Sequence, residues 1–188
     1  MFVFSPGVQA AVAVSGDRNT YLPVRRIRLS AAGDLSVLSP VFFQSLPEKT
    51  SARALRRQED RLFLLLAALF SDSTAVPFAY VTGIALSHRS VWCEHTLYVS
   101  QARPVAQTIN PEDSIAWAYD GEKPLLQERA DQVMGSLCKT IETARKTPSG
   151  ILPGDMVAVG AELEIRAVPA RDFCAGVNGI GSVRLTWH

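Results

Sequence analysis

The sequence contains little cysteine and no long apolar run, and each absence excludes a class of protein. Cys93, Cys138 and Cys174 are too few and too widely spaced for a disulfide framework or a zinc site. No uninterrupted apolar stretch approaches the roughly 18 residues that a transmembrane helix needs. The first residues lack a basic segment and soon reach Pro6-Gly7, which is not typical of a signal peptide. These features favour a reduced, cytoplasmic protein without a membrane partner.

Length and composition indicate a folded chain. With 188 residues, of which 47% are hydrophobic and 20% charged, the chain can bury a sizeable core, so we expect a single domain over 1–188. The charge is uneven, because residues 1–66 hold nine basic and five acidic groups whereas 67–188 hold ten and thirteen. An alternative division is therefore a basic β-meander with a helix over 1–75, followed by a strand-rich part over 76–188.

The hydrophobic pattern predicts an α+β fold that is rich in strands. Short apolar runs between turn residues predict strands over 8–14, 21–29, 35–43, 78–86, 91–100, 114–119, 156–159, 163–168 and 182–187. Apolar residues at helical spacing predict one helix from Thr50 or Ser51 to Phe70 and a second over 125–146. We expect mixed or antiparallel β-structure with these two principal helices.

The C-terminal segment carries a resemblance to a known superfamily. A Pro153-Gly154-Asp155 turn precedes a final Gly179-Ile180-Gly181-Ser182-Val183 stretch. In this order of motifs the segment resembles the fumarylacetoacetate hydrolase superfamily, and most closely its 2-hydroxypenta-2,4-dienoate hydratase and oxalocrotonate decarboxylase branch. The resemblance is good over 151–188 and weak back to residue 114.

The resemblance implies a fold and an activity. It implies a hydratase- or decarboxylase-like protein that acts on a small oxo-acid, or a relative that has lost catalysis, with self-association as a further expectation. We also expect the strands from Met156 to Trp187 to form one antiparallel structure, with Gly179 or Gly181 at a bulge or at a positive φ.

Members of the superfamily hold a divalent cation with a Glu-x-Glu pair and a third carboxylate, since hard cations need several oxygen ligands. The Glu-x-Glu of this chain, Glu162-Leu163-Glu164, follows the Pro-Gly-Asp turn and so lies on the wrong side of it. Glu94 and Glu112 are the remaining candidate ligands, although neither has the family's spacing. The resemblance therefore implies Mg²⁺ or Mn²⁺, with activity that depends on these two glutamates.

Two histidines and a glutamate form a candidate catalytic group. His88, Glu94 and His95 flank a Trp-Cys pair. In a strand over 91–100, His95 shares a face with Cys93, and Glu94 takes the other face. A histidine with a carboxylate partner can act as a general base near neutral pH. The alternative is that both histidines are structural residues of a loop and an edge strand.

Arginine is the other notable feature, since the chain has fifteen arginines and four lysines. Seven of them lie close together on a predicted strand and on one face of the first predicted helix: Arg25, Arg26, Arg28, Arg53, Arg56, Arg57 and Arg61. Such a group can bind a phosphate backbone.

The stretch 175–181 resembles the glycine-rich loop of CRISPR-associated repeat-RNA-binding proteins. The alternative function is therefore a nucleic-acid-binding subunit of a ribonucleoprotein, with RNA and other protein subunits as partners. Two simpler alternatives are a solvated helix face that pairs with Glu59 and Asp60, and a purely structural subunit.

Overall fold

The computed structural model describes residues 10–31, 34–38, 43–47, 49–54, 60–72, 76–88, 91–164 and 172–187. A two-stranded hairpin at the start of this part consists of β1 (Ala10–Val14) and β2 (Asp17–Val24). An eight-stranded sheet consists of β3 (Arg26–Ala31), β4 (Asp34–Leu38), β5 (Phe43–Ser45), β7 (Asp60–Leu69), β8 (Ala79–His88), β9 (Val91–Val99), β10 (Arg103–Pro104) and β13 (Asp155–Leu163). A five-stranded sheet consists of β6 (Ser51–Ala54), β11 (Ile115–Asp120), β12 (Lys123–Arg129), β14 (Asp172–Val177) and β15 (Gly181–Trp187).

The helices of the described chain are short. They are α1 (Ala130–Met134), α2 (Leu137–Lys146) and two 3₁₀ turns, η1 (Val105–Gln107) and η2 (Pro111–Asp113). None of the helices in the described ranges is long and apolar enough to cross a membrane.

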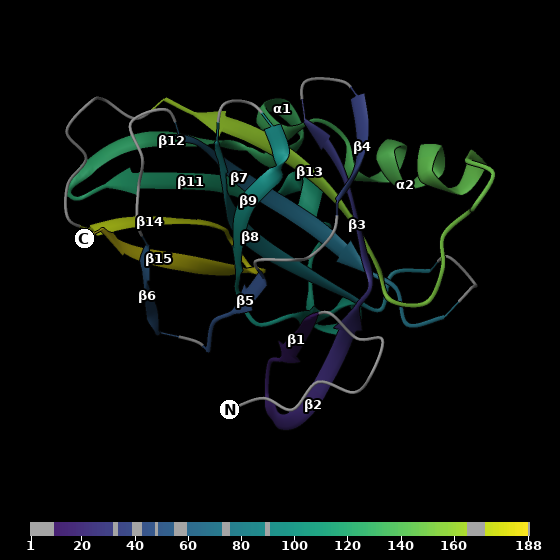
Figure 1. Ribbon diagram of the computed structural model, residues 1–188. Helices are drawn as coiled ribbons and strands as arrows, with labels where there is room; N and C mark the ends of the chain where they lie inside the picture. The colour runs from purple at the N-terminus through teal and green to yellow at the C-terminus, as the bar shows by residue number, and fades with distance from the viewer. Residues whose placement is uncertain are drawn as a thin grey trace.

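The two sheets have mixed strand directions. The large sheet has the order β4-β3-β13-β7-β8-β9-β5, with β10 paired to β8, and the smaller sheet has the order β12-β11-β14-β15-β6 (Figure 1). The pairs β13–β3, β5–β9 and β15–β6 are parallel, and the other pairs are antiparallel. The strand-rich α+β class expected from the sequence is therefore confirmed.

Strand β7 is buried on both of its faces. Leu64 and Leu66 pack into the core between the two sheets, whereas Phe63 and Leu65 pack on the opposite face of the large sheet. A strand covered on both faces has a continuous apolar run, which periodicity alone does not distinguish from a buried helix. The predicted helix from residue 50 or 51 to 70 is therefore wrong. The chain forms β6 and β7 there, and 55–59 lie outside the described residues.

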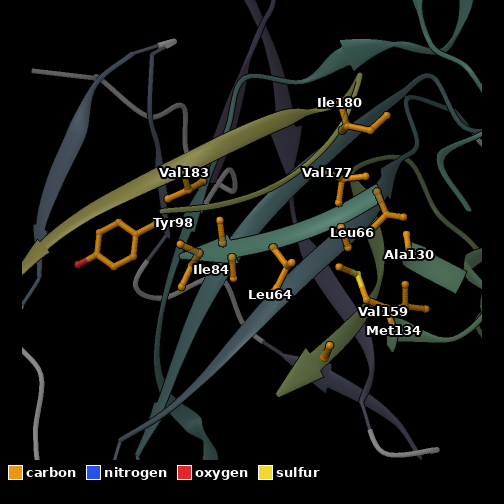
Figure 2. Close-up of a cluster of buried hydrophobic side chains, with 14 of the residues drawn as sticks. Leu64, Leu66, Ile84, Tyr98, Ala130, Met134, Val159, Val177, Ile180 and Val183 are labelled. Carbon is orange, nitrogen blue, oxygen red and sulfur yellow. The ribbon is translucent and has the colours of Figure 1, made fainter. Parts of the chain in front are cut away.

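The main core fills the space between the large and the small sheet. Figure 2 shows Ile84 of β8 and Val159 of β13 in the same cluster as Val177 and Val183 of the β14–β15 hairpin. Helix α1 closes one side of this core with Met134. A second core on the outer face of the large sheet is covered by the β1–β2 hairpin.

The second predicted helix forms only in part. Residues 123–129 belong to β12, and Gly135, at φ +81°, separates α1 from α2. Helix α2 begins after Ser136, whose side chain accepts a hydrogen bond of 3.1 Å from the Lys139 N–H. Such capping by serine is the usual way to satisfy a free N–H at the start of a helix.

The predicted strand over 21–29 is divided at Arg25 into β2 and β3, which belong to different sheets. The predicted positive φ in the tail is confirmed at Gly179, which has φ +75°. It lies in the β14–β15 turn, where the Ile180 N–H donates to the Val177 carbonyl at 3.0 Å. The expectation of one antiparallel tail is wrong, because β13 lies in the large sheet and β14 and β15 lie in the small one.

Candidate functional site

The predicted acid–base residues lie on the β8–β9 hairpin. His88 is the last residue of β8 and is aligned with Asp60 of β7. Glu94 and His95 belong to β9. The structure describes the backbone of these residues, and their side chains lie outside the described part, so their catalytic role stays a prediction.

Glu112 lies in η2 and accepts hydrogen bonds from the start of α2. Its Oε1 accepts hydrogen bonds from the Ser136 hydroxyl at 2.9 Å and from the Cys138 N–H at 2.8 Å. A carboxylate at this position satisfies a free N–H and interacts favourably with the positive end of the helix dipole. Burial raises the pKa of the Cys138 thiol, and the charge of Glu112 raises it further. One oxygen of this predicted metal ligand is therefore engaged within the fold.

The Glu-x-Glu motif is also engaged. Glu162 of β13 forms an ion pair with Arg61 of β7, and Arg61 Nε donates to Oε1 at 2.5 Å. The hydrogen bond to Glu162 raises the pKa of Arg61, and the guanidinium lies 5.5 Å from the ring centroid of Phe63. Within the described ranges, no three His, Cys, Asp or Glu side chains form a group that could hold a metal ion. The described residues thus do not fit the divalent cation that the resemblance implies.

Two of the predicted nucleic-acid-binding arginines are used inside the protein. Arg26 forms a paired contact with Asp155, with Nε–Oδ1 at 2.9 Å and Nη2–Oδ2 at 2.5 Å. Arg28 is 1% exposed and donates to the Ala144 carbonyl at 2.9 Å and to the Gly150 carbonyl. Burial and then repulsion from Arg26 lower the pKa of Arg28, while Asp155 acts in the opposite direction. These two side chains tie β3 and β13 to the end of α2.

The remaining arginines do not form the predicted stripe. Arg53 lies on β6 of the small sheet and Arg61 lies on β7 of the large one, because the helix that was to align them does not form. Arg56 and Arg57 lie outside the described residues. Arg25 is exposed, and its backbone N–H donates to the Gly154 carbonyl at 2.7 Å.

A pocket that the sequence did not predict lies beside the β14–β15 turn, and we call it the turn pocket. It has a volume of about 270 Å³. Four parts of the chain line it: the β1–β2 turn, the link between β5 and β6, residues 100–103 after β9, and the β14–β15 turn. Trp117 of β11 adds an indole to the wall. Ligand pockets commonly have roughly 300 to 1,000 Å³, so this volume fits a molecule of a few heavy atoms.

The described lining of the turn pocket has a positive charge. It contains Lys49 and Arg103 and no carboxylate. The Nε atom of Arg103 is buried and has no hydrogen-bond partner among the described residues. Leaving a buried donor unpaired costs about 1 to 3 kcal/mol, and more for a charged group. The positive charge of the described lining, with no carboxylate beside it, is suited to a small anion.

The backbone around Arg103 is fixed from two sides. The neighbouring Ala102 N–H donates to the Ala13 carbonyl, and the Ser15 N–H donates to the Ala102 carbonyl, both at 2.8 Å. On its other side Arg103 is aligned with Tyr80 of β8. No sequence signal marked Arg103 or Lys49, because each is a single basic residue whose neighbours in space come from distant segments.

Comparison with solved structures shows the fold. A fumarylpyruvate hydrolase from Pseudomonas aeruginosa, in complex with Mn²⁺ and pyruvate, superposes with a TM-score of 0.74 at 13% identity over 100% of this chain and 99% of that one. A maleylpyruvate hydrolase from Sphingobium sp. SYK-6, in complex with manganese(II) and pyruvate, gives 0.66 at 11% identity over 86% and 69%. A 2-hydroxyhepta-2,4-diene-1,7-dioate isomerase from Mycobacterium marinum gives 0.58 at 13% identity over 90% and 81%.

By sequence, no family model and no curated protein matches the chain. The agreement in fold nevertheless extends over the whole chain, including the β-rich tail that carries the sequence resemblance. This chain therefore has the fold of the fumarylacetoacetate hydrolase superfamily.

Proposed function

We propose that this protein acts on a small oxo-acid, with hydratase- or decarboxylase-like chemistry. The observation that carries the proposal is the superposition over 100% of the chain on a hydrolase bound to pyruvate. Proteins of this fold that are described as hydrolases or isomerases supply the substrate class. The free thiols of Cys138 and Cys174 support a cytoplasmic location. Self-association stays part of the proposal.

The proposed chemistry uses acid–base side chains. His88 and His95 are the proposed bases and Glu94 is their carboxylate partner, since a histidine is able to exchange protons near neutral pH. We derive no step through a metal ion, because the described carboxylates do not cluster and both Glu112 and Glu162 are engaged in contacts within the fold. The alternative as a nucleic-acid-binding subunit is less favoured, because Arg26 and Arg28 face Asp155 and the end of α2.

Turnover of defined oxo-acids tests the proposal. We expect the purified chain to decarboxylate oxaloacetate or to hydrate 2-hydroxypenta-2,4-dienoate, in assays run both with Mn²⁺ and in a chelator. Replacing His88, Glu94 or His95 by Gln should reduce kcat/KM at least tenfold, which corresponds to about 1.4 kcal/mol of transition-state stabilisation. Lys139→Gln, an exposed change on α2, is the control. Absence of turnover with and without Mn²⁺, or full activity of all three variants, would contradict the proposal.

A further inference from the structure

We propose that the turn pocket is a binding site for a small carboxylate, held by Arg103 and Lys49 without a metal ion. The inference goes beyond the proposed function, because the pocket binds its acid whether or not the β8–β9 hairpin catalyses a reaction. The pocket begins at Ser100, directly after the nine-residue strand β9, whose far end joins β8. At about 3.3 Å per residue, His95 lies about 17 Å along β9 from Ser100, and His88 lies beyond the far end of β9.

Arg103 is the first element of the site. Its backbone is held between the β1–β2 hairpin and β8, so its side chain starts from a fixed point. The side chain is half-buried and its Nε is unpaired among the described residues. A guanidinium offers parallel N–H donors that match the two oxygens of a carboxylate. Because the Nε atom is covered by the protein, a bound carboxylate would meet the guanidinium at its outer N–H groups.

Lys49 is the second element. It lies in the short link between β5 and β6 and is exposed, so its ammonium group can reach the solvent side of the pocket. Its φ is +66°, and it is the non-glycine residue with a positive φ in the described chain. This conformation disfavours residues with a side chain and suits glycine. Strained backbone positions of this kind cluster at ligand-binding segments, which favours a use for the charge of Lys49.

Trp117 and the residues of the β14–β15 turn limit the shape of the ligand that fits the pocket. The indole of Trp117 is half-buried and lies 5.9 Å from the ring of Tyr119, centroid to centroid. It forms an apolar part of the wall together with Ile180 of the β14–β15 turn, which is 3% exposed. The pocket thus offers cations for an acidic group and an apolar wall for a short carbon chain. This combination favours a small carboxylic acid over inorganic phosphate.

Calorimetric titration of the full chain with sodium pyruvate tests the site. In a chelator and at constant ionic strength, we expect one ligand to bind per chain with a dissociation constant below roughly 10 mM. Arg103→Gln should weaken binding at least tenfold, because the fork and its charge are lost. Lys49→Gln should weaken it several-fold, as an exposed charge contributes less. The matched controls are Arg145→Gln and Lys139→Gln, both exposed on α2, and they should bind as the parent does.

Further variants keep the test decisive. If Arg103→Gln loses its folded circular dichroism, Arg103→Lys keeps the charge without the fork and should still weaken binding. Lys49→Gly should keep or raise the melting temperature, because glycine suits a positive φ, and it should weaken binding. A lysine with a purely structural role would not give a stable variant with weaker binding. No binding of pyruvate at millimolar concentrations, or equal affinity of Arg103→Gln and the controls, overturns the inference. Tighter binding of inorganic phosphate than of pyruvate overturns the carboxylate assignment. If the parent protein binds pyruvate but turns over none of the oxo-acids, the proposed function is contradicted and the binding site is not.

Discussion

The protein holds two arginine-centred groups that differ in how their charges are neutralised. Arg26 and Arg28 face Asp155, which is 1% exposed, and the carbonyl groups at the end of α2. Arg103, in contrast, has no carboxylate in the described lining around it, although its buried Nε lacks a hydrogen-bond partner in the described chain just as the Nε of Arg28 does. The first group holds strands and helix together, and the second leaves charge available. We therefore expect anion binding to depend on whether an arginine is available rather than on the number of arginines in a stretch.

The strongest test of this contrast is Asp155→Asn. The change leaves Arg26 and Arg28 without their counter-charge at a site where Asp155 also accepts the Leu152 N–H at 3.0 Å. Removing one partner from a buried ion pair costs about 3 to 5 kcal/mol. We expect this loss in the free energy of unfolding by urea denaturation. Asp172→Asn is the control, because its pair with Arg184 is exposed and should cost less than about 1 kcal/mol. If both variants lose the same free energy of unfolding, the buried Asp155 group is no more structural than the exposed Asp172–Arg184 pair.

Replacing each arginine by methionine gives the next largest effect. Arg28→Met removes donors to the Ala144 carbonyl and the Thr147 hydroxyl and should destabilise the protein by about 3 kcal/mol. Arg103→Met removes an unpaired donor and keeps much of the apolar stem, so its free energy of unfolding should lie within about 1 kcal/mol of the parent's. Chemical denaturation of both variants under the same conditions measures the difference. A loss at Arg103 as large as that at Arg28 would show that Arg103 is structural.

Part of the fold follows from the sequence, and the errors have a physical cause. The Gly179 turn and the final strand were predictable because a positive φ and an apolar alternation are local features. Strand β7 was not, since burial on both faces depends on the β1–β2 hairpin and on the small sheet, neither of which local sequence reveals. Strand β14 escaped prediction because Ala175 and Gly176 have low β-propensity.

The candidate site was harder to predict from the sequence than the fold was. The turn pocket brings together residues from five separate segments, and its two cations are isolated in the chain. The clustered arginines predicted a binding surface instead, although Arg26 and Arg28 are engaged with Asp155. Spacing in a sequence does not show which charges are already paired, because that depends on the tertiary contacts of a buried carboxylate.

A smaller effect is expected at the start of α2. Glu112→Ala removes the acceptor for the Ser136 hydroxyl and the Cys138 N–H and should destabilise the protein by about 1 kcal/mol. Glu112→Gln keeps an acceptor oxygen and should lose less. Because the charge of Glu112 contributes to the raised pKa of Cys138, Glu112→Ala should lower that pKa. Alkylation of Cys138 near pH 8, followed by mass spectrometry, should then be faster than in the parent. If both the alkylation rate and the stability are unchanged, Glu112 does not stabilise the start of α2.

The smallest effect belongs to the Arg61–Glu162 pair, which stands between the two arginine groups of the comparison. It joins one arginine to one carboxylate, whereas Asp155 faces two arginines, and its side chains are 42% and 41% exposed. Exposed ion pairs contribute only about 0.2 to 1 kcal/mol and are screened by salt. A double-mutant cycle with Arg61→Gln and Glu162→Gln should therefore give a coupling energy in that range that decreases when NaCl is raised. A coupling above about 2 kcal/mol, or one insensitive to salt, would place this pair with the buried group and would show that pairing alone, without burial, makes an arginine structural here.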